Sequence, residues 1–319
     1  MALPQSINLK NPNAMSAILT AGGLRTQSNL RRFMGLALCL LLAIPVAAQE
    51  RFSLFVPTEQ EDVPRMLKLA GLKDGDMVYD LGSGDGRIVF EAAKMYPAVR
   101  GRGIEIDEKL VMESRKVASA NGLANRVEFL HQNAFDADLK DADIIAMWLW
   151  PELMRMLRPK ILAEARPGTR IITRIWDLGP TWKPDAVDTN GAQLFMWIVP
   201  AQVAGNWNWE LEFAKAKRPY AAILEQQFQT VEGVVRSGNR RGVMDTMKLA
   251  GEEISFSLMI TLDGAGLARH QFRGRVKGDT IEGTVRIMHE PYDTAFELPW
   301  RAARTATSTY FAPTGVSVK

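Results

Sequence analysis

The 319-residue sequence predicts an α/β domain built on a doubly wound, mostly parallel sheet, followed by a smaller all-β domain. Between residues 55 and 185, short apolar runs alternate with amphipathic stretches of about 10 to 15 residues, which is typical of strands joined by crossover helices. After Pro184 the helical period disappears, and short alternating runs are separated by turn signals such as SGN and KGD. We therefore expect a Rossmann-like domain over 55–185, an antiparallel barrel or sandwich over 190–303, and a flexible tail over 304–319.

The first domain is expected to begin with an amphipathic helix in EDVPRMLKLAGL, where Pro64 is tolerable only in the first turn. The predicted strands, in chain order, are MVYDLG, RGRGIEID, RVEFLHQNA, ADIIAMWLW and TRIITRIW. The predicted helices between them are GRIVFEAAKMY, EKLVMESRKVASANGL and PELMRMLRPKILAEA.

In the second domain, evenly spaced short runs predict an antiparallel meander. The predicted strands are NWNWELEF, YAAILEQQFQTVEGVV, GVMDTMKLAG, EISFSLMITL, LARHQFRGRV, DTIEGTVRIMH and TAFELPW. The aromatic residues Trp207, Trp209, Phe256, Phe272 and Trp300 alternate with polar residues as core side chains do. A ligand cavity lined by them is the alternative.

Residues 1–48 resemble an export signal. The first 49 residues carry basic side chains and no acid, and Arg31-Arg32 precede the apolar run FMGLALCLLLAIPVAA, which ends in small residues before Gln49. The run is shorter than the roughly 20 apolar residues of a spanning helix. We expect a cleaved signal peptide, with a membrane anchor through residues 31–48 as the alternative. An exported location follows, either periplasmic or anchored at the inner membrane.

Composition excludes several classes of function. Removing the four basic residues of the leader from the total of 39 leaves 35 against 36 acids, a net charge of −1, so bulk charge does not favour a nucleic-acid partner. Cys39 is the only cysteine and lies in the leader, which excludes disulfide and thiolate chemistry in a mature chain. His131, His270 and His289 are scattered without ligand spacing, so no metal site is expected.

The stretch VYDLGSGDGRIVF combines three alternate glycines with two carboxylates, Asp80 and Asp85. Glycines between a strand and a helix let the backbone approach a ligand closely. Dinucleotide sites use G-x-G-x-x-G and bind a pyrophosphate, whereas the spacing here is G-x-G-x-G. Two anions a few Å apart cost on the order of 1 kcal/mol even at high effective dielectric. The acids therefore favour a cationic ligand, and S-adenosylmethionine carries both an ammonium and a sulfonium group.

A further acid, Glu105, follows Asp80 by 25 residues at the end of GIEID. An acid at the end of the second strand reaches ribose hydroxyls in nucleotide-binding βαβ units. Both ligand classes share this feature, so it supports a nucleoside without choosing between them.

The segments VYDLGSGDGRIV, GIEID and RVEFLHQNAF together resemble the class I, seven-strand S-adenosylmethionine-dependent methyltransferases. The resemblance implies that Asp80 faces the methionine amino group, that the glycine loop lines the methionine and ribose, and that Glu105 holds the ribose hydroxyls. Asn133 and Phe135 would flank the adenine, although the usual residue at the position of Asn133 is Asp. The implied cofactor contacts are Pro57, Thr58, Asp80, Gly82, Ser83, Gly84, Asp85, Gly86, Glu105, Ile106, Asn133 and Phe135.

A narrower resemblance covers residues 55–185. FVPTEQEDVPRML, WLWPELMRMLRPKI and PGTRIITRIWDLGPTWKP are similar to bacterial methyltransferase-like proteins and to a mitochondrial protein-lysine methyltransferase family. This resemblance implies that Val56 to Thr58 close over the cofactor, and it alone points to lysine as the acceptor. WLWPE lies where open α/β sheets place substrate. The pocket candidates are Trp148, Trp150, Pro151 and Glu152, with plain core aromatics as the alternative for the tryptophans.

Three functions fit these patterns. The first is an S-adenosylmethionine-dependent methyltransferase acting on a protein lysine by in-line methyl transfer. The second is an exported S-adenosylmethionine-binding or catalytically inactive structural protein, because a signal peptide would separate an enzyme from a cytosolic donor; a cytoplasmic location would remove that conflict. The third is a methyltransferase for a small molecule. The absence of an N-P-P-Y tetrapeptide argues against methylation of nucleic-acid bases.

Overall fold

The computed structural model describes residues 56–289 and 292–307. The predicted leader over 1–48 and residues 308–319 of the predicted tail lie outside the described residues. Residues 304–306, predicted as part of a flexible tail, instead belong to the last barrel strand, β15 (Tyr292–Ala306). None of the helices in the described ranges is long and apolar enough to cross a membrane.

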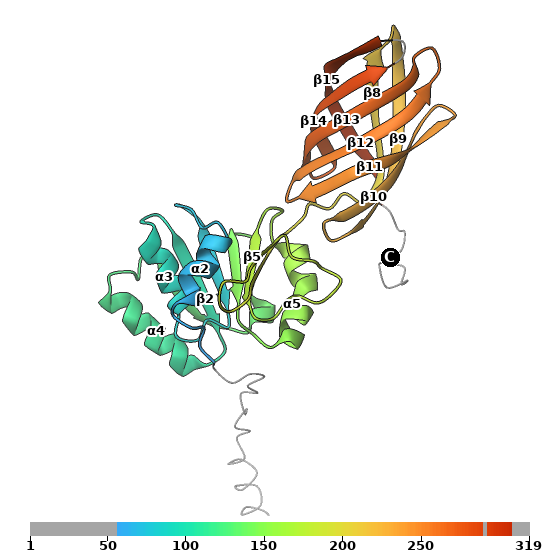
Figure 1. Ribbon diagram of the computed structural model, residues 1–319. Coiled ribbons are helices and arrows are strands. Elements are labelled where there is room, and N and C mark those ends of the chain that lie inside the picture. The colour runs from blue at the N-terminus through green and yellow to red at the C-terminus, as the bar shows by residue number, and fades with distance from the viewer. Residues whose placement is uncertain (1–55, 290–291, 308–319) are drawn as a thin grey trace, which may run out of the picture. The chain divides into compact units, whose positions relative to one another are not determined.

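The first domain (Figure 1) contains a seven-stranded sheet, whose strands lie in the order β3-β2-β1-β4-β5-β7-β6. Strands β1 to β5 pair in parallel, whereas β7 pairs antiparallel with both β5 and β6. The strands are β1 (Met77–Leu81), β2 (Arg100–Glu105), β3 (Val127–His131), β4 (Ile144–Met147), β5 (Arg170–Arg174), β6 (Ala186–Asp188) and β7 (Leu194–Ile198). The chain order reverses between β1 and β4, and ligands of open α/β sheets bind at the carboxyl ends of strands at such a point.

Helices cover both faces of this sheet, which confirms the doubly wound arrangement. They are α2 (Asp62–Leu69), α3 (Arg87–Met95), α4 (Glu108–Ala120) and α5 (Pro151–Glu164), with a short 3₁₀ helix η2 (Ala134–Asp136) after β3. Val78 and Ile144 pack with α2 and α3, whereas Leu81 and Met147 pack with α5. Alternate residues of a strand point to opposite faces, so each strand contributes to both cores. Pro64 lies in the first turn of α2, as expected.

The sheet extends further along the chain than the sequence indicates. A boundary between residues 185 and 190 would separate β6 from β7, but these two strands pair with each other, and β7 pairs with β5 in the same sheet. An antiparallel strand at the edge of a parallel sheet needs no crossover helix, so its sequence resembles that of the β domain that follows.

The second domain is a closed antiparallel barrel of eight strands in the order β10-β11-β12-β13-β14-β15-β8-β9. The strands are β8 (Gly205–Phe213), β9 (Ala216–Gln227), β10 (Thr230–Ser237), β11 (Arg240–Ala250), β12 (Glu253–Leu262), β13 (Gly266–Lys277), β14 (Thr280–His289) and β15 (Tyr292–Ala306). Pairing of β15 with β8 closes the barrel, which decides between the expected barrel and sandwich. The run YAAILEQQFQTVEGVV, predicted as one strand, is divided between β9 and β10 by a turn at Phe228, where φ is +55°.

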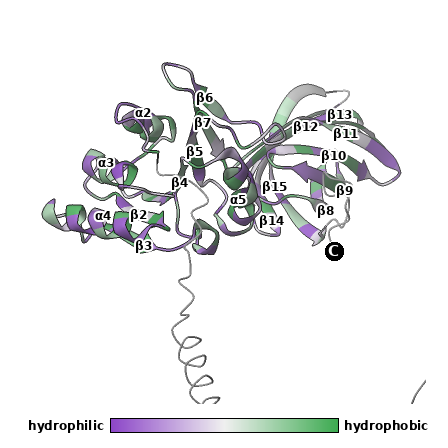
Figure 2. Ribbon diagram, turned by 90° about the horizontal axis from the view of Figure 1, so that it is seen from below, coloured by the Kyte–Doolittle hydropathy of each residue, from purple (hydrophilic) through white to green (hydrophobic). Residues whose placement is uncertain are grey.

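The barrel interior is a packed aromatic core. The ring centroids of Phe256 and Phe272 are 4.5 Å apart, and those of Phe272 and Trp300 are 4.8 Å apart. Trp207 and Trp209 are also buried in this cluster. Figure 2 shows hydrophobic and hydrophilic residues alternating along the barrel strands, as inward and outward positions require. The core interpretation of the five alternating aromatic residues is therefore confirmed.

Candidate active site

The glycine loop between β1 and α3 has left-handed backbone at every glycine: φ is +80° at Gly82, +53° at Gly84 and +78° at Gly86. The N–H groups of Gly82 and Ser83 donate to the carbonyl of Ile104 at 2.8 and 3.0 Å, which fixes the loop to β2. A Cβ on Gly86 would lie 2.5 Å from Cε1 of Phe129, closer than real Cβ contacts allow. Both conformation and space therefore require glycine at this position.

Replacing Gly86 by Ala should destabilise the protein strongly. The left-handed conformation costs an L-residue about 1–2 kcal/mol, and forcing a methyl group against Phe129 adds about 1–3 kcal/mol. Gly122 is the matched control, because its φ is +67° but a Cβ there would meet nothing within 4 Å. Urea unfolding should show a clearly larger loss of unfolding free energy for Gly86→Ala than for Gly122→Ala. Equal losses would contradict the close contact with Phe129.

Asp80 is the most unusual acid in the site. Asp80 is 2% exposed on β1, and within the described part of the chain its carboxyl group makes no hydrogen bond or ion pair. Burial, followed by the neighbouring charges of Glu105 and Asp85, raises the pKa of Asp80 to about 8. A buried acid without a partner fits a site that receives a cation, since a cation would compensate the carboxylate charge.

Glu105 is held rigidly at the end of β2. Its Oε2 accepts from the Gly84 N–H at 2.9 Å, and its Oε1 accepts from the N–H groups of Ile106 and Asp107 at 2.8 and 2.9 Å. Oε1 already accepts two hydrogen bonds, whereas Oε2 keeps a further lone pair, so the group can still accept a hydrogen bond from a ligand's hydroxyl. The predicted positions Glu105 and Ile106 thus adjoin the glycine loop.

Asp85 differs from the sequence interpretation, in which it is a bare charge facing the ligand. Its carboxylate forms an ion pair with Arg87, with 2.5 Å between Nη2 and Oδ2 and 2.9 Å between Nε and Oδ1. Partial burial opposes ionisation, but the hydrogen bonds and charge of Arg87 lower the pKa of Asp85 overall. The expectation that Asp85 is a bare charge facing the ligand is therefore wrong, because the neighbouring Arg87 pairs with it. The preference for a cationic ligand over an anionic one therefore depends mainly on Asp80 and Glu105.

Arg87 also connects the loop to the segment before α2. Its Nη1 donates to the carbonyl of Thr58 at 2.5 Å. Thr58 is buried, whereas Pro57 is exposed. The structure therefore places Thr58 against the start of α3; closure of this segment over a cofactor stays a prediction.

Asn133 and Phe135 lie after β3, beside the end of β2. The Asn133 Oδ1 accepts from the Phe135 N–H at 3.0 Å and caps the short helix η2. The neighbouring Gln132 N–H donates to the Glu105 carbonyl at 3.0 Å, which brings this turn next to Glu105. The carbonyl oxygen of Asn133 keeps one lone pair, which is available to accept a hydrogen bond from the adenine amino group. The expected contact with adenine stays a prediction.

The segment after β4 adjoins the glycine loop, since a Cβ on Gly82 would lie 2.5 Å from Cδ2 of Leu149. Trp148 is half-buried, with the Arg174 guanidinium 5.2 Å from its ring centroid, and Trp150 is 52% exposed. Neither tryptophan is a fully buried core residue. Pro151 begins α5, and the Glu152 carboxylate lies 2.8 Å from Arg155.

A strained turn at the end of β5 completes this edge. Ile175 has φ of +63°, and the Trp176 N–H donates to the Arg174 carbonyl at 2.7 Å, which defines a three-residue γ-turn. A β-branched residue in the left-handed region is strained, and such strain clusters at functional sites. The turn is held by Thr173, whose hydroxyl donates to the Trp176 carbonyl at 2.6 Å. Ile175 and Trp176 are 41% and 44% exposed.

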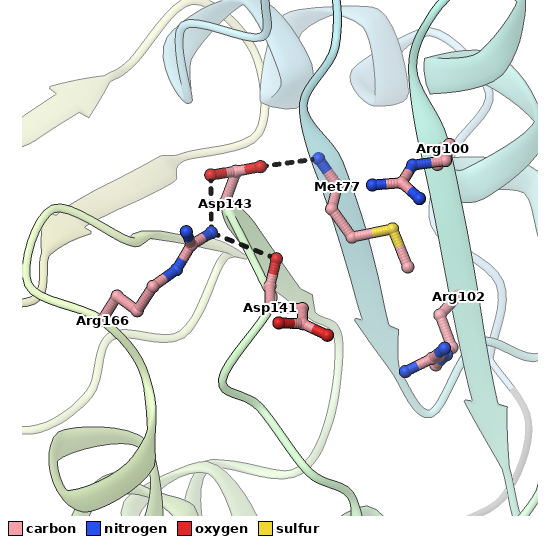
Figure 3. Close-up of a pocket in the computed structure, with 6 residues that line it drawn as sticks. All are labelled: Met77, Arg100, Arg102, Asp141, Asp143 and Arg166. Carbon is pink, nitrogen blue, oxygen red and sulfur yellow. Dashed lines mark hydrogen bonds and ion pairs between the residues drawn. The ribbon is translucent and has the colours of Figure 1, made fainter.

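A separate cavity of about 390 Å³ lies at the opposite, amino ends of the strands (Figure 3). Its lining residues are Met77, Arg100, Arg102, Asp141, Asp143 and Arg166. Asp143 accepts from the Met77 N–H at 2.9 Å and pairs with Arg166 at 3.0 Å. These contacts fix the strand starts, and the cavity does not adjoin the glycine loop.

Comparison with known proteins decides the family. The model of the ANTKMT methyltransferase domain matches residues 80–186. The protein-lysine N-methyltransferase of Saccharolobus islandicus is 35% identical over 133 residues, which cover 42% of this chain and 82% of that protein. The chain belongs to the protein-lysine methyltransferase family.

Other proteins match a similar share of the chain. The adenine nucleotide translocase lysine N-methyltransferase of Mus musculus is 33% identical over 139 residues, which cover 43% of this chain and 58% of that protein. A solved RNA methyltransferase from Salinibacter ruber with bound S-adenosyl-L-homocysteine has 41% identity and a TM-score of 0.45, covering 46% of this chain and 96% of that one.

The methyltransferase has S-adenosylmethionine as its methyl donor, and the residues present fit this molecule. Asp80 offers an unpartnered carboxyl group, and the Ser83 hydroxyl is buried without a hydrogen-bond partner among the described residues. The three glycines of the loop beside them contribute only backbone. Together they form a cradle for a small ligand that carries an ammonium group and hydroxyls.

Sequence reasoning missed Arg87, Ile175 and Trp176. Arg87 directly follows the last glycine of the loop, so its pairing with Asp85 could have been anticipated from their separation of two residues. The turn at Ile175 leaves no signal, because RIITRIW has the composition of a continuous strand and isoleucine is among the residues least expected at positive φ.

Proposed function

We propose that this methyltransferase transfers its methyl group to the side-chain nitrogen of a lysine in a protein acceptor. The observation that carries the proposal is the buried, unpartnered Asp80 beside a bare-backbone loop, next to an edge lined by exposed apolar side chains. The lysine part is supported by relatives whose names specify lysine methylation of proteins.

The chain's own residues would align and desolvate the reaction. Bound S-adenosylmethionine supplies an activated methyl group, so a nitrogen–carbon bond forms as the sulfur–carbon bond breaks in line. Asp80 would orient the methionine ammonium and Glu105 the ribose. The acceptor must lose a proton before it attacks, and an apolar environment lowers the pKa of a lysine. Trp150 and Trp176, exposed at the ends of neighbouring strands, would provide that environment and exclude water.

The test is transfer of a radiolabelled methyl group from S-adenosylmethionine into a whole-cell extract by the full chain. We expect label in protein, released as methyl-lysine after acid hydrolysis. Label confined to RNA or to small molecules would contradict a protein acceptor. The variant Asp80→Asn is the negative control.

We also propose that residues 1–48 direct the chain to the periplasm or hold it at the inner membrane through residues 31–48. The support is the basic, acid-free leader and its apolar run. This leader favours a second candidate function, an exported protein that binds S-adenosylmethionine without turnover. Fractionation of cells that carry a C-terminally tagged chain tests the location. Recovery of the tag only in the cytoplasm would exclude export and, with it, the second function.

A further inference from the structure

The outer face of the barrel carries a continuous row of exposed apolar side chains. Ile223, Val234, Val243 and Met259 are 50%, 53%, 71% and 55% exposed. The strand registers set Val234 directly opposite both Ile223 and Val243, and the β11–β12 register sets Met259 beside Val243. This apolar row therefore crosses four neighbouring strands, β9 to β12 (Figure 1), over about 14 Å. Contiguous exposed apolar patches mark interaction surfaces.

Charges of opposite sign flank the apolar row. Residues two positions apart on a strand share a face. On β10, Glu232 and Arg236 therefore lie on either side of Val234. On β11, Arg241 and Asp245 lie on either side of Val243. Because β10 and β11 are antiparallel, both arginines lie on one side and both acids on the other. We name Arg236 and Arg241 the basic flank. Glu225, Glu232 and Asp245 form the acidic flank.

Within each flank, like charges are neighbours. Arg236 is directly opposite Arg241, and Glu232 is directly opposite Glu225. Like charges in such cross-strand positions destabilise a sheet. The arrangement costs stability in the isolated barrel, which a partner of matching charge would offset.

Neither flank finds its counter-ions within the described ranges of the chain. No ion pair involves any residue of the basic or acidic flank there. Other exposed charges of the barrel do pair, as Lys277 does with Glu282 at 2.7 Å and Arg275 with Glu252 at 3.0 Å. The charges that flank the exposed apolar row thus have no counter-ion among the described residues.

We propose that this face of β9 to β12 is an interface between two copies of the chain. A two-fold axis along the apolar row sets each residue of the row against its own copy and exchanges the flanks. Arg236 then faces the partner's Glu232, and Arg241 faces the partner's Asp245. A two-fold axis along the strands would instead set each flank against itself. Charge complementarity therefore selects a single arrangement of the dimer.

The face is small compared with the roughly 800 Å² per partner of a standard stable interface. The dimer is therefore expected to be weak and concentration-dependent. Because the charged flanks surround the row at the solvent boundary, association should also weaken as salt is added.

Two variants with reversed flanks test the proposal in the full chain by sedimentation velocity. The basic variant carries Glu232→Arg and Asp245→Arg, and the acidic variant carries Arg236→Glu and Arg241→Glu. The wild type should dimerise as its concentration is raised to about 0.1 mM, because weak interfaces have dissociation constants in the micromolar range. Each variant alone should associate at least about tenfold more weakly, because like flanks then face each other. An equimolar mixture of the two variants should dimerise again.

A control for the basic variant makes the same change in net charge outside the face: Glu113→Arg with Glu297→Arg, on α4 and β15. It should dimerise like the wild type. A wild type that stays monomeric over this range would overturn the proposal. So would association that persists in both single variants, or a mixture of the two variants that stays monomeric.

Discussion

Replacing Asp80 by Asn should abolish binding of S-adenosylmethionine and at the same time stabilise the free protein at neutral pH. The first effect follows because the substitution removes the buried carboxylate that would pair with the methionine ammonium. Truncating one partner of a buried charge pair costs about 2–5 kcal/mol, or about 30-fold or more in affinity. Titration calorimetry measures the loss directly.

The second effect follows from the raised pKa of Asp80. In the unfolded chain this carboxyl ionises near pH 4, whereas in the fold its pKa is about 8. Between those values the folded state binds more protons than the unfolded state, so stability falls as pH rises through this window. Asn does not ionise and avoids that cost. Urea unfolding at pH 7 should therefore show a more stable variant.

Asp141→Asn is the matched control for both measurements, because Asp141 is exposed and lines the cavity at the amino ends of the strands. It should bind the cofactor and unfold like the wild type. If Asp80→Asn bound normally, the cation-receiving role of Asp80 would be wrong. If it lost binding and stability together, the substitution would have disturbed the fold instead.

The features that sequence predicts best are those whose cause is local. The glycine loop is an example, since positive φ and a close backbone approach leave glycine as the only suitable residue at Gly86. Alternation of apolar and polar residues likewise reveals which side of each barrel strand is buried, as at Trp207 and Trp209. In both cases one short segment contains the information.

The features that sequence does not predict depend on distant partners. Barrel closure requires Asn208 of β8 to pair with Ala303 of β15, across most of the β domain, and nothing in either strand distinguishes closure from an open sandwich. The assignment of β7 to the first sheet depends on its pairing with β5. Trp148 and Trp150 alone indicate a substrate edge in the sequence, whereas Ile175 and Trp176 require the turn to be seen.

The two acids of the glycine loop, Asp80 and Asp85, differ in a way that the sequence does not show. In the sequence, Asp85 counts as a determinant of ligand charge, yet its pair with Arg87 leaves little net charge there. The cationic preference survives because Asp80 lacks such a partner. A variant at Arg87 would therefore test the loop's attachment to Thr58 rather than its charge.

Affinity for S-adenosylmethionine should rise about tenfold per pH unit between pH 5.5 and 7, with close to one proton released on binding. The free protein holds a proton on Asp80 in this range, because its pKa is about 8. The bound ammonium favours the ionised carboxylate, so the pKa falls and the proton leaves. An α-amino group has a pKa of about 7.7–8.0, so the ligand stays cationic throughout the window.

Calorimetry in buffers of different ionisation enthalpy counts the released proton. His131 is an imidazole close to the site, since its Nε2 lies 3.0 Å from the carbonyl of Ile106. The variant His131→Gln should keep both the slope and the proton count if Asp80 is their source. Binding that releases no proton, or a slope that disappears in His131→Gln, would show that Asp80 is already ionised before the ligand arrives.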